Sequence, residues 1–275
     1  MRDNVANRRR MRFTSKLRTA ALVLRENGPV WCLELLTYYA ASMLADRAYA
    51  AMDRRRRSLR LPGLNSASLN REIWNAWDWG AGGEEWTQSQ QWKQSLLSCV
   101  LERWVAAGSR ILEIGPGGGR WTAHLLPRAR DYVGIDISSA CIEKCASLFR
   151  DNSHARFIVG SGSDLSGVAD TSIDVIWSFD VFVHINRREI DAYAREFARV
   201  LKPGALAVIH HGTVGGSAGG WRSDLTNEAL GEILGSLGLE VESSISQWND
   251  GNQIHELSFE DRITIIRKPD VGMGQ

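Results

Sequence analysis

Residues 91–268 alternate between two spacings of apolar side chains. Short apolar runs that end at glycine or polar residues predict strands, and segments with apolar residues three or four apart predict helices. The predicted strands are 110–114, 131–136, 155–159, 173–179, 205–211, 239–247 and 262–267. The predicted helices are 91–106, 119–127, 139–149, 187–200 and 226–236. This alternation is typical of an α/β domain with a doubly wound, largely parallel sheet.

Residues 1–60 form a helical extension without a strand pattern, and Gly28-Pro29 interrupts it. Its apolar residues form one stripe at helical spacing, made of Leu33, Leu36, Tyr39, Ala40, Met43 and Leu44. Arginines cluster at 8–12 and 54–57. We favour a helical arm that packs on its own domain or on a second subunit. The alternative is an interfacial helix on an anionic membrane, or a contact with a glycan synthase. No nucleic-acid-reading module accompanies the charge, which disfavours nucleic acid as a partner.

The composition is that of an ordinary globular protein, with 44% hydrophobic and 24% charged residues, so disorder is not expected. The net charge of +1 is unevenly distributed. Residues 1–60 hold 14 basic and 5 acidic residues, a balance of +9, and the remainder holds 19 and 27, a balance of −8. The chain therefore joins a basic arm to an acidic body.

The four cysteines give no disulfide framework for 275 residues, which favours a reducing, cytoplasmic environment. Cys141 and Cys145 make at most half a zinc site, and nothing nearby completes it. Arg18 and Arg25 interrupt the apolar stretch that a secretory signal would need. Residues 30–52 include three charged side chains, which makes them a poor membrane span. We expect a cytoplasmic protein, with peripheral attachment to the inner face of a membrane as the alternative.

Residues 61–92 are a linker or cap rich in glycine and tryptophan, between the arm and the domain 93–268, which a tail at 269–275 follows. Its indoles are Trp74, Trp77, Trp79, Trp86 and Trp92. At least half of them are expected to wedge the cap onto the domain. Flat aromatic faces also match the apolar face of a pyranose ring, so Trp79 and Trp86 are candidate acceptor contacts.

The motif Ile111-Leu-Glu-Ile-Gly-Pro-Gly-Gly-Gly119 ends a predicted strand and opens a helix. Its glycines let the backbone turn sharply and approach a ligand. Asp136 ends the next strand, where a carboxylate can accept hydrogen bonds from two ribose hydroxyls. Glu113 would repel a pyrophosphate and attract a cation. S-adenosylmethionine carries a sulfonium and an amino group and lacks phosphate, so the pattern favours this methyl donor over a dinucleotide.

With these features, residues 109–268 resemble a class I S-adenosylmethionine-dependent methyltransferase. Residues 174–184 are similar to the family's fourth strand and its loop, and residues 197–204 to its turn into the fifth strand. Trp77-Asp-Trp79, Gly83-Glu-Glu-Trp86-Thr, Trp177-Ser-Phe-Asp-Val-Phe-Val-His184 and Gly220-Trp-Arg-Ser223 resemble a bacterial subgroup of sugar and polysaccharide O-methyltransferases. The resemblance implies a Rossmann-like seven-stranded sheet whose final pair of strands is antiparallel.

The resemblance also implies a cofactor site. Glycines 115, 117 and 119 would leave room for the methionine portion of the cofactor, and Glu113 would anchor its amino group. Asp136 would bind the ribose. Besides Gly115, Gly117 and Gly119, the expected cofactor contacts are Ile137, Gly162, Ser163 and Ser178, with Trp121 and Asp164 as further candidates.

The acceptor is expected at the carboxyl edge of the sheet. His184 follows the fourth strand and is our candidate general base, with Asp180 orienting it or acting in its place. His210 and His211 point to opposite faces, so at most one faces the acceptor, and we assign His211. The other candidate acceptor contacts are Trp79, Trp86, Trp221 and Arg222. No metal is predicted, because no ligand spacing indicates one.

The predicted activity is therefore methylation of a hydroxyl, on a sugar or glycan precursor. A phenolic or natural-product acceptor is the first alternative. Two nucleic-acid types are excluded, because Ser178-Phe-Asp-Val181 replaces the Asn/Asp-Pro-Pro-aromatic turn of the N6-adenine type, and no cysteine lies where the C5-pyrimidine type needs one. A non-catalytic cofactor-binding subunit is a further alternative, disfavoured by the intact glycines and Asp136.

Overall fold

The chain forms two compact units that divide after Leu61. The computed structural model describes residues 13–216 and 220–270, with side chains from residue 18. The first unit is helix α1 (Phe13–Ser58), in which Gly28 has a left-handed φ of +80° and Pro29 follows. The predicted break at Gly28-Pro29 is confirmed, and residues 8–12 lie outside the described range. No helix within that range is long and apolar enough to cross a membrane.

The second unit is built on a seven-stranded sheet. Its strands are β1 (Ser109–Ile114), β2 (Ala129–Asp136), β3 (Ala155–Val159), β4 (Ile173–Phe182), β5 (Leu201–His211), β6 (Glu240–Ile245) and β9 (Arg262–Arg267). They follow the order β3-β2-β1-β4-β5-β9-β6, with β9 antiparallel to both neighbours. The predicted doubly wound sheet and its antiparallel final pair are confirmed.

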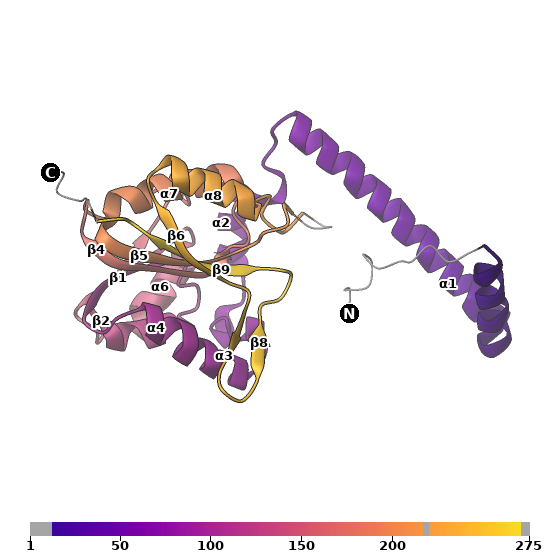
Figure 1. Ribbon diagram of the computed structural model, residues 1–275, viewed down its shortest axis with the longest axis horizontal. Helices are drawn as coiled ribbons and strands as arrows, with labels where there is room; N and C mark the ends of the chain where they lie inside the picture. The colour runs from indigo at the N-terminus through magenta and orange to yellow at the C-terminus, as the bar shows by residue number, and fades with distance from the viewer. Residues whose placement is uncertain (1–12, 217–219, 271–275) are drawn as a thin grey trace. The chain divides into compact units, whose positions relative to one another are not determined.

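Helices cover both faces of this sheet (Figure 1). Helices α7 (Arg187–Val200) and α8 (Asn227–Ser236) lie on one face, and α3 (Gln90–Leu96) and α4 (Glu102–Trp104) lie on the other. Successive residues of a strand point to opposite faces. Leu112 and Ile176 accordingly join the core under α7, and Ile111 and Trp177 join the core under α3. Burial on both faces explains why the central strands have continuous apolar runs.

Local structure departs from the predictions in four places. Helix α2 (Ala67–Ala76), whose N-cap is Ser66, lies in the segment predicted as a linker. The predicted helix 91–106 contains a π-helical turn at Leu97–Leu101. The predicted helix 119–127 is reduced to α5 (Thr122–Leu125) and a 3-10 turn. The predicted strand 239–247 ends at Ile245, and a hairpin of β7 (Gln247–Asn249) and β8 (Ile254–Glu256) follows.

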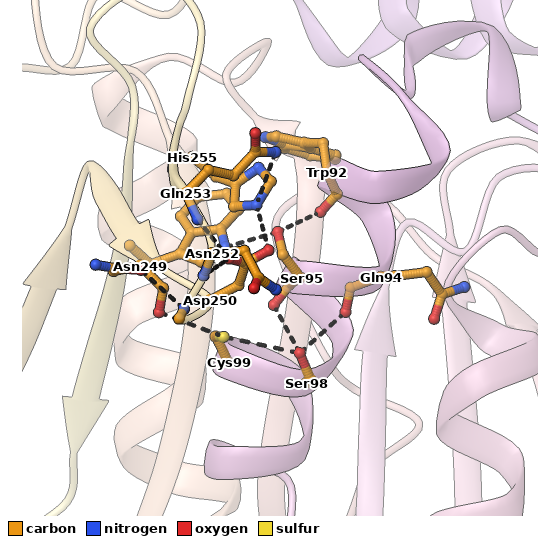
Figure 2. A network of polar contacts seen from close by, with 12 residues as sticks. Trp92, Gln94, Ser95, Ser98, Cys99, Asn249, Asp250, Asn252, Gln253 and His255 are labelled. Carbon is orange, nitrogen blue, oxygen red and sulfur yellow. Dashed lines mark hydrogen bonds and ion pairs between the residues drawn. The ribbon is translucent and has the colours of Figure 1, made fainter.

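The β7–β8 hairpin is tied to helix α3 by polar contacts (Figure 2). Trp248 donates its indole N–H to Ser95 Oγ (2.9 Å), and Trp92 donates to the carbonyl of Glu256 (3.0 Å). Within the hairpin, His255 Nε2 lies 2.8 Å from Asp250 Oδ2. These contacts fix where β8 ends, and therefore where the next residues, 257–261, enter the functional site.

Helix α6 (Ser139–Leu148) completes the layer beside β2 and β3. Its N-cap Ser138 accepts a hydrogen bond from the backbone N–H of Cys141 (3.2 Å). Both Cys141 and Cys145 are buried free thiols, in keeping with a packing role.

Candidate active site

A cavity of about 410 Å³ lies where the parallel strands end, a size that suits a small-molecule ligand. Most of its lining comes from four segments. These are the glycine loop at 114–118, the cap at 65–92, residues 179–185 at the end of β4 and directly after it, and the segment 257–261 after the hairpin. Ends of several strands converge here because parallel strands share their carboxyl edge.

The glycine loop is pressed between the β4 loop and the cap. Gly115 has a φ of +72°, and a Cβ there would lie 2.2 Å from Val181 Cγ2. A Cβ on Gly118 would lie 2.5 Å from Gly82 Cα, so two backbones touch at that point. Trp79 closes over Gly117, where a Cβ would approach its ring to 2.9 Å. Glycine is therefore required at these positions by conformation or by space.

Asp136 is held against the glycine loop from the end of β2. Its Oδ2 accepts the backbone N–H of Gly117 (3.1 Å), and its Oδ1 accepts that of Ser138 (2.9 Å). Burial raises the pKa of Asp136 to about 6, although the backbone hydrogen bonds oppose the shift. Ile137 and Gly162 line the same cavity. The carboxylate is thus fixed in place for a polar ligand group.

The cap is fastened to the domain by both polar and aromatic contacts. Asn75 Oδ1 accepts a hydrogen bond from the Ser138 hydroxyl (2.7 Å), and Asn70 donates to the carbonyl of His184 (3.1 Å). The rings of Trp74, Trp79 and Trp86 lie 5.6–6.0 Å apart in mutual contact. These indoles both hold the cap together and line the cavity.

His184 lines the cavity with a defined tautomer. Its Nδ1 lies 2.9 Å from the carbonyl oxygen of Trp221. Because a carbonyl only accepts, Nδ1 carries the hydrogen and Nε2 keeps its lone pair. Burial lowers the pKa of His184, and the hydrogen bond to Trp221 only partly offsets this. A neutral imidazole with an available acceptor nitrogen suits a general base.

Five alternating charges form a second wall, which we call the charge chain: Arg120, Asp180, His210, Asp261 and Arg222. Its ends are ion pairs, Arg120 with Asp180 and Arg222 with Asp261. Between them, His210 Nδ1 lies 3.0 Å from Asp180 and Nε2 lies 3.3 Å from Asp261. Burial disfavours the charged imidazole, but the two carboxylates outweigh it and raise the pKa of His210. His210 and His184 thus have opposite charge preferences.

The sequence between residues 111 and 204 matches the family model of a methyltransferase domain. The chain contains a methyltransferase domain. A 2-methyl-6-phytyl-1,4-hydroquinone methyltransferase of Synechocystis sp. is 32% identical over 106 residues, which are 37% of this chain and 31% of that protein. An uncharacterized methyltransferase of Mycobacterium sp. (strain JLS) is 29% identical over 134 residues, 46% of this chain and 51% of that protein. The chain therefore spans about a third to a half of the length of these relatives.

A solved structure has the same fold. The N-methyltransferase NodS from Bradyrhizobium japonicum WM9, in complex with S-adenosyl-L-homocysteine, matches with a TM-score of 0.54 and 21% identity, over 75% of this chain and 99% of that chain. The match to the methyltransferase-domain model confirms the predicted methyltransferase domain and its cofactor, S-adenosylmethionine, and the likeness to NodS confirms the predicted fold. The cavity of this domain, with its glycine loop and buried Asp136, fits such a cofactor.

Most predicted site residues do meet in this cavity of the methyltransferase domain. They are Gly115, Gly117, Asp136, Ile137, Gly162, Trp79, Trp86, Asp180, His184 and Arg222, with Trp121 beside them. Their individual roles stay predictions. Within residues 13–216 and 220–270, no group of His, Cys, Asp and Glu has the arrangement of a metal site.

Two predicted cofactor contacts of the methyltransferase domain need correction. Glu113 is buried beneath the glycine loop, where its carboxylate accepts hydrogen bonds from the hydroxyls of Thr122 (2.7 Å) and Tyr132. Burial raises its pKa to about 7, despite both hydrogen bonds. Ser178 is also buried, and it donates to the carbonyl of Ile114 (2.9 Å). Neither side chain lines the cavity. Both stabilise the floor on which the glycine loop rests.

Four more of the predicted site residues lie outside the cavity lining. Gly119 leaves space for the ring of Phe149, which a Cβ would approach to 2.9 Å. Ser163 lies in a local turn, where its N–H donates to Ser161 Oγ (3.3 Å). Trp221 is exposed, and only its carbonyl reaches His184.

His211 is the clearest of these corrections. It is fully buried, and its Nε2 contacts Thr264 Oγ1 (2.8 Å), so the assignment of His211 to the acceptor is wrong. His210 lines the cavity instead, because it points to the face that carries Phe179, whose ring it stacks on at 4.3 Å.

Sequence reasoning missed Arg120 and Asp261. Arg120 directly follows Gly119, the last glycine of the motif, so its position alone signalled a residue at the cavity. Asp261 precedes β9, and because β9 runs antiparallel to β5, it begins at the edge of the sheet where β5 ends. That topology, once predicted, places residues before the last strand beside His210.

Proposed function

We propose that this protein transfers the methyl group of S-adenosylmethionine to a hydroxyl of a sugar or glycan precursor. The observation that carries the proposal is His184, a neutral imidazole whose Nε2 is available in the cavity that Asp136 also lines. Such a nitrogen can accept the proton of a hydroxyl, which is otherwise a poor nucleophile.

The cofactor end is formed by residues that bind and orient. Asp136 would accept hydrogen bonds from two ribose hydroxyls, while Ile137 and Gly162 would enclose the adenine. The glycine loop leaves space for the methionine portion. When bound, S-adenosylmethionine supplies an electrophilic methyl group.

The acceptor end works chiefly by positioning. Well-oriented groups can gain effective molarities of about 10⁵–10⁸ M, so holding the hydroxyl in line accounts for much of the rate. His184 Nε2 takes the hydroxyl proton, and the Trp221 carbonyl holds the ring in the orientation that this requires. The cap indoles exclude water from this end.

The indoles of Trp74, Trp79 and Trp86 favour a sugar as acceptor. The faces of these indoles can pack on the C–H face of a pyranose ring, while the polar groups of the charge chain can form hydrogen bonds with the hydroxyls of the sugar. A phenolic acceptor would pack on the same indoles but would leave most of the charge chain without a hydrogen-bond partner.

The test is methyl transfer from tritium-labelled S-adenosylmethionine to matched acceptors: methyl glycosides, short oligosaccharides and catechol. We expect the label in a sugar ether and none in catechol. Label in catechol alone would replace the sugar proposal with the phenolic one. Failure of the protein to bind S-adenosylhomocysteine in a separate titration would contradict methyl transfer altogether.

Helix α1 favours a second proposal, that the arm binds an anionic membrane surface. Closely spaced apolar residues such as Val30, Trp31 and Leu33 point to different sides of the helix, and their exposed fractions are 44–70%. An apolar surface of this extent is usually covered by a partner or a lipid. Arg54 and Arg55 near its end would meet acidic headgroups.

Co-sedimentation of the full chain with vesicles tests this second proposal. We expect binding to phosphatidylglycerol vesicles and weak binding to phosphatidylcholine. The double change Arg54→Gln and Arg55→Gln should weaken binding about 30-fold, since each arginine near the surface contributes about 1 kcal/mol and tenfold is about 1.4 kcal/mol. Equal binding to both lipids, or to neither, would contradict it.

A further inference from the structure

Arg222 has hydrogen-bonding capacity that the protein does not use. Its Nη2 is paired with Asp261, whereas within residues 13–216 and 220–270 its Nε and Nη1 have no hydrogen-bond partner. Its guanidinium carbon lies 4.9 Å from the ring centre of Phe259, so the ring supports the flat face of the group. The side chain lines the cavity. A planar donor group is therefore held at the wall with two nitrogens available.

The charge chain contains more basic groups than acidic ones. Arg120, His210 and Arg222 face only two carboxylates, those of Asp180 and Asp261. The other carboxylates that line the cavity, Asp136 and Glu189, make no ion pair with the chain. A cavity wall with more basic than acidic groups favours an anionic ligand.

The segment that carries this wall is strained. Phe259 and Glu260 both have left-handed φ angles, 61° and 60°, and neither is glycine. Asp180, in the same charge chain, has a φ of 62°. Each residue in this backbone conformation raises the free energy of the folded state by on the order of 1–3 kcal/mol, and such residues cluster at sites where function requires the geometry. The hairpin anchored on α3 holds Phe259 and Asp261 in place despite that cost.

We propose that Arg222 binds an anionic group of the acceptor, so that the substrate is an acidic sugar, either a uronic acid or a sugar phosphate. Arg222 Nη1 and the second N–H of Nη2 form a parallel pair of donors, and a carboxylate or phosphate accepts two parallel hydrogen bonds from such a pair. Phe259, which is 73% exposed while it lines the cavity, covers the same end of the site. This inference rests on the proposed sugar methyl transfer and specifies its substrate class.

The test is calorimetric titration of the protein saturated with S-adenosylhomocysteine. The probes are methyl α-D-glucopyranoside, D-glucuronate and D-glucose 1-phosphate, which separate a neutral sugar from a carboxylate and from a phosphate. We expect at least one anionic sugar to bind about tenfold or more tightly than the neutral glycoside. Raising the NaCl concentration should weaken the anionic sugar only.

Variants assign the effect to Arg222. Arg222→Gln should remove the preference for the anion and leave the affinity for S-adenosylhomocysteine unchanged. Arg222→Lys keeps the charge beside Asp261 but loses the planar fork, so it should retain part of the preference. The matched control is Arg195→Gln, at an exposed arginine on α7 that pairs with Asp191 (3.1 Å). Arg195→Gln should change neither the preference for the anionic sugar nor the affinity for S-adenosylhomocysteine.

Equal affinity for neutral and anionic sugars would overturn the inference, as would an unchanged preference in Arg222→Gln. Failure of both anions to bind the loaded protein would also overturn it. In each case, binding of S-adenosylhomocysteine is measured first, so a failure of the methyltransferase proposal itself is recognised separately.

Discussion

Replacing His184 with glutamine should lower kcat for methyl transfer by about 10²–10⁴-fold, the usual contribution of a general base. Glutamine can still donate a hydrogen bond to the Trp221 carbonyl, but it offers no basic nitrogen to the acceptor. The affinity for S-adenosylhomocysteine should stay the same. The measurement is the initial rate at saturating cofactor and acceptor, with calorimetry as the check on binding.

The pH dependence of kcat reports the protonation of His184. The pKa of His184 is lowered by burial, so its neutral form dominates at neutral pH. The kcat of the wild type should therefore rise with pH through that lowered pKa and be flat at neutral pH. His210 has a raised pKa and remains the charged member of the pair as the pH rises past that point.

The control for His184 is His154→Gln, at a histidine outside the cavity lining that lies 3.4 Å from the Leu126 carbonyl. It should leave both kcat and its pH profile unchanged. A His184→Gln enzyme with wild-type kcat would place the base elsewhere, and Asp180 would be the next residue to change.

Replacing Asp136 with alanine should weaken the binding of S-adenosylhomocysteine by about 100-fold or more. Two hydrogen bonds from ribose hydroxyls to a carboxylate contribute about 1.5–3 kcal/mol each, and tenfold in affinity is about 1.4 kcal/mol. Isothermal titration measures the change. Asp131→Ala, on the same strand, is the matched control, because Asp131 pairs with Arg110 (2.7 Å) outside the cavity lining.

The raised pKa of Asp136 predicts a pH dependence of cofactor binding. With a pKa of about 6, the carboxylate is ionised above that pH and protonated below it. The wild-type affinity should therefore fall as the pH drops below about 6, and Asp136→Ala should not show this fall.

A separate measurement of the unfolding temperature distinguishes loss of the site from loss of the fold. Asp136→Asn retains an acceptor for one backbone N–H and should bind with intermediate affinity. Full affinity in a folded Asp136→Ala protein would show that the cofactor does not depend on this carboxylate.

The sequence predicts the floor of the site better than its walls. Strand ends and glycines have local signals, so Gly115, Asp136 and Ile137 were located from the pattern of the chain. The direction of a side chain at a strand end depends on which face carries the cap. His210 and His211 differ only in this respect, and no local signal distinguishes them.

Other departures have tertiary causes. Glu113 was expected to face the ligand, but hydroxyls from Thr122 and a neighbouring strand, at Tyr132, hold it below the loop. The Asn249-Asp-Gly251 turn signal between β7 and β8 is present in the sequence, but the predicted strand 239–247 joined the end of β6 to the start of β7, so the hairpin was not predicted. The partners of Asp261 could be assigned only once β9 was placed beside β5.

The contact between Gly82 and Gly118 has a consequence for how acceptor preference can diversify. A Cβ on Gly118 would lie 2.5 Å from Gly82 Cα, and Gly82 has a left-handed φ of +68°, so a side chain at either position is strained and the cap and the glycine loop resist reshaping there. The wall formed by residues 257–261 has no such restriction, because the β7–β8 hairpin that precedes these residues is not part of the seven-stranded sheet. Exchanging this hairpin is thus the natural route to a new acceptor with an unaltered methyl donor.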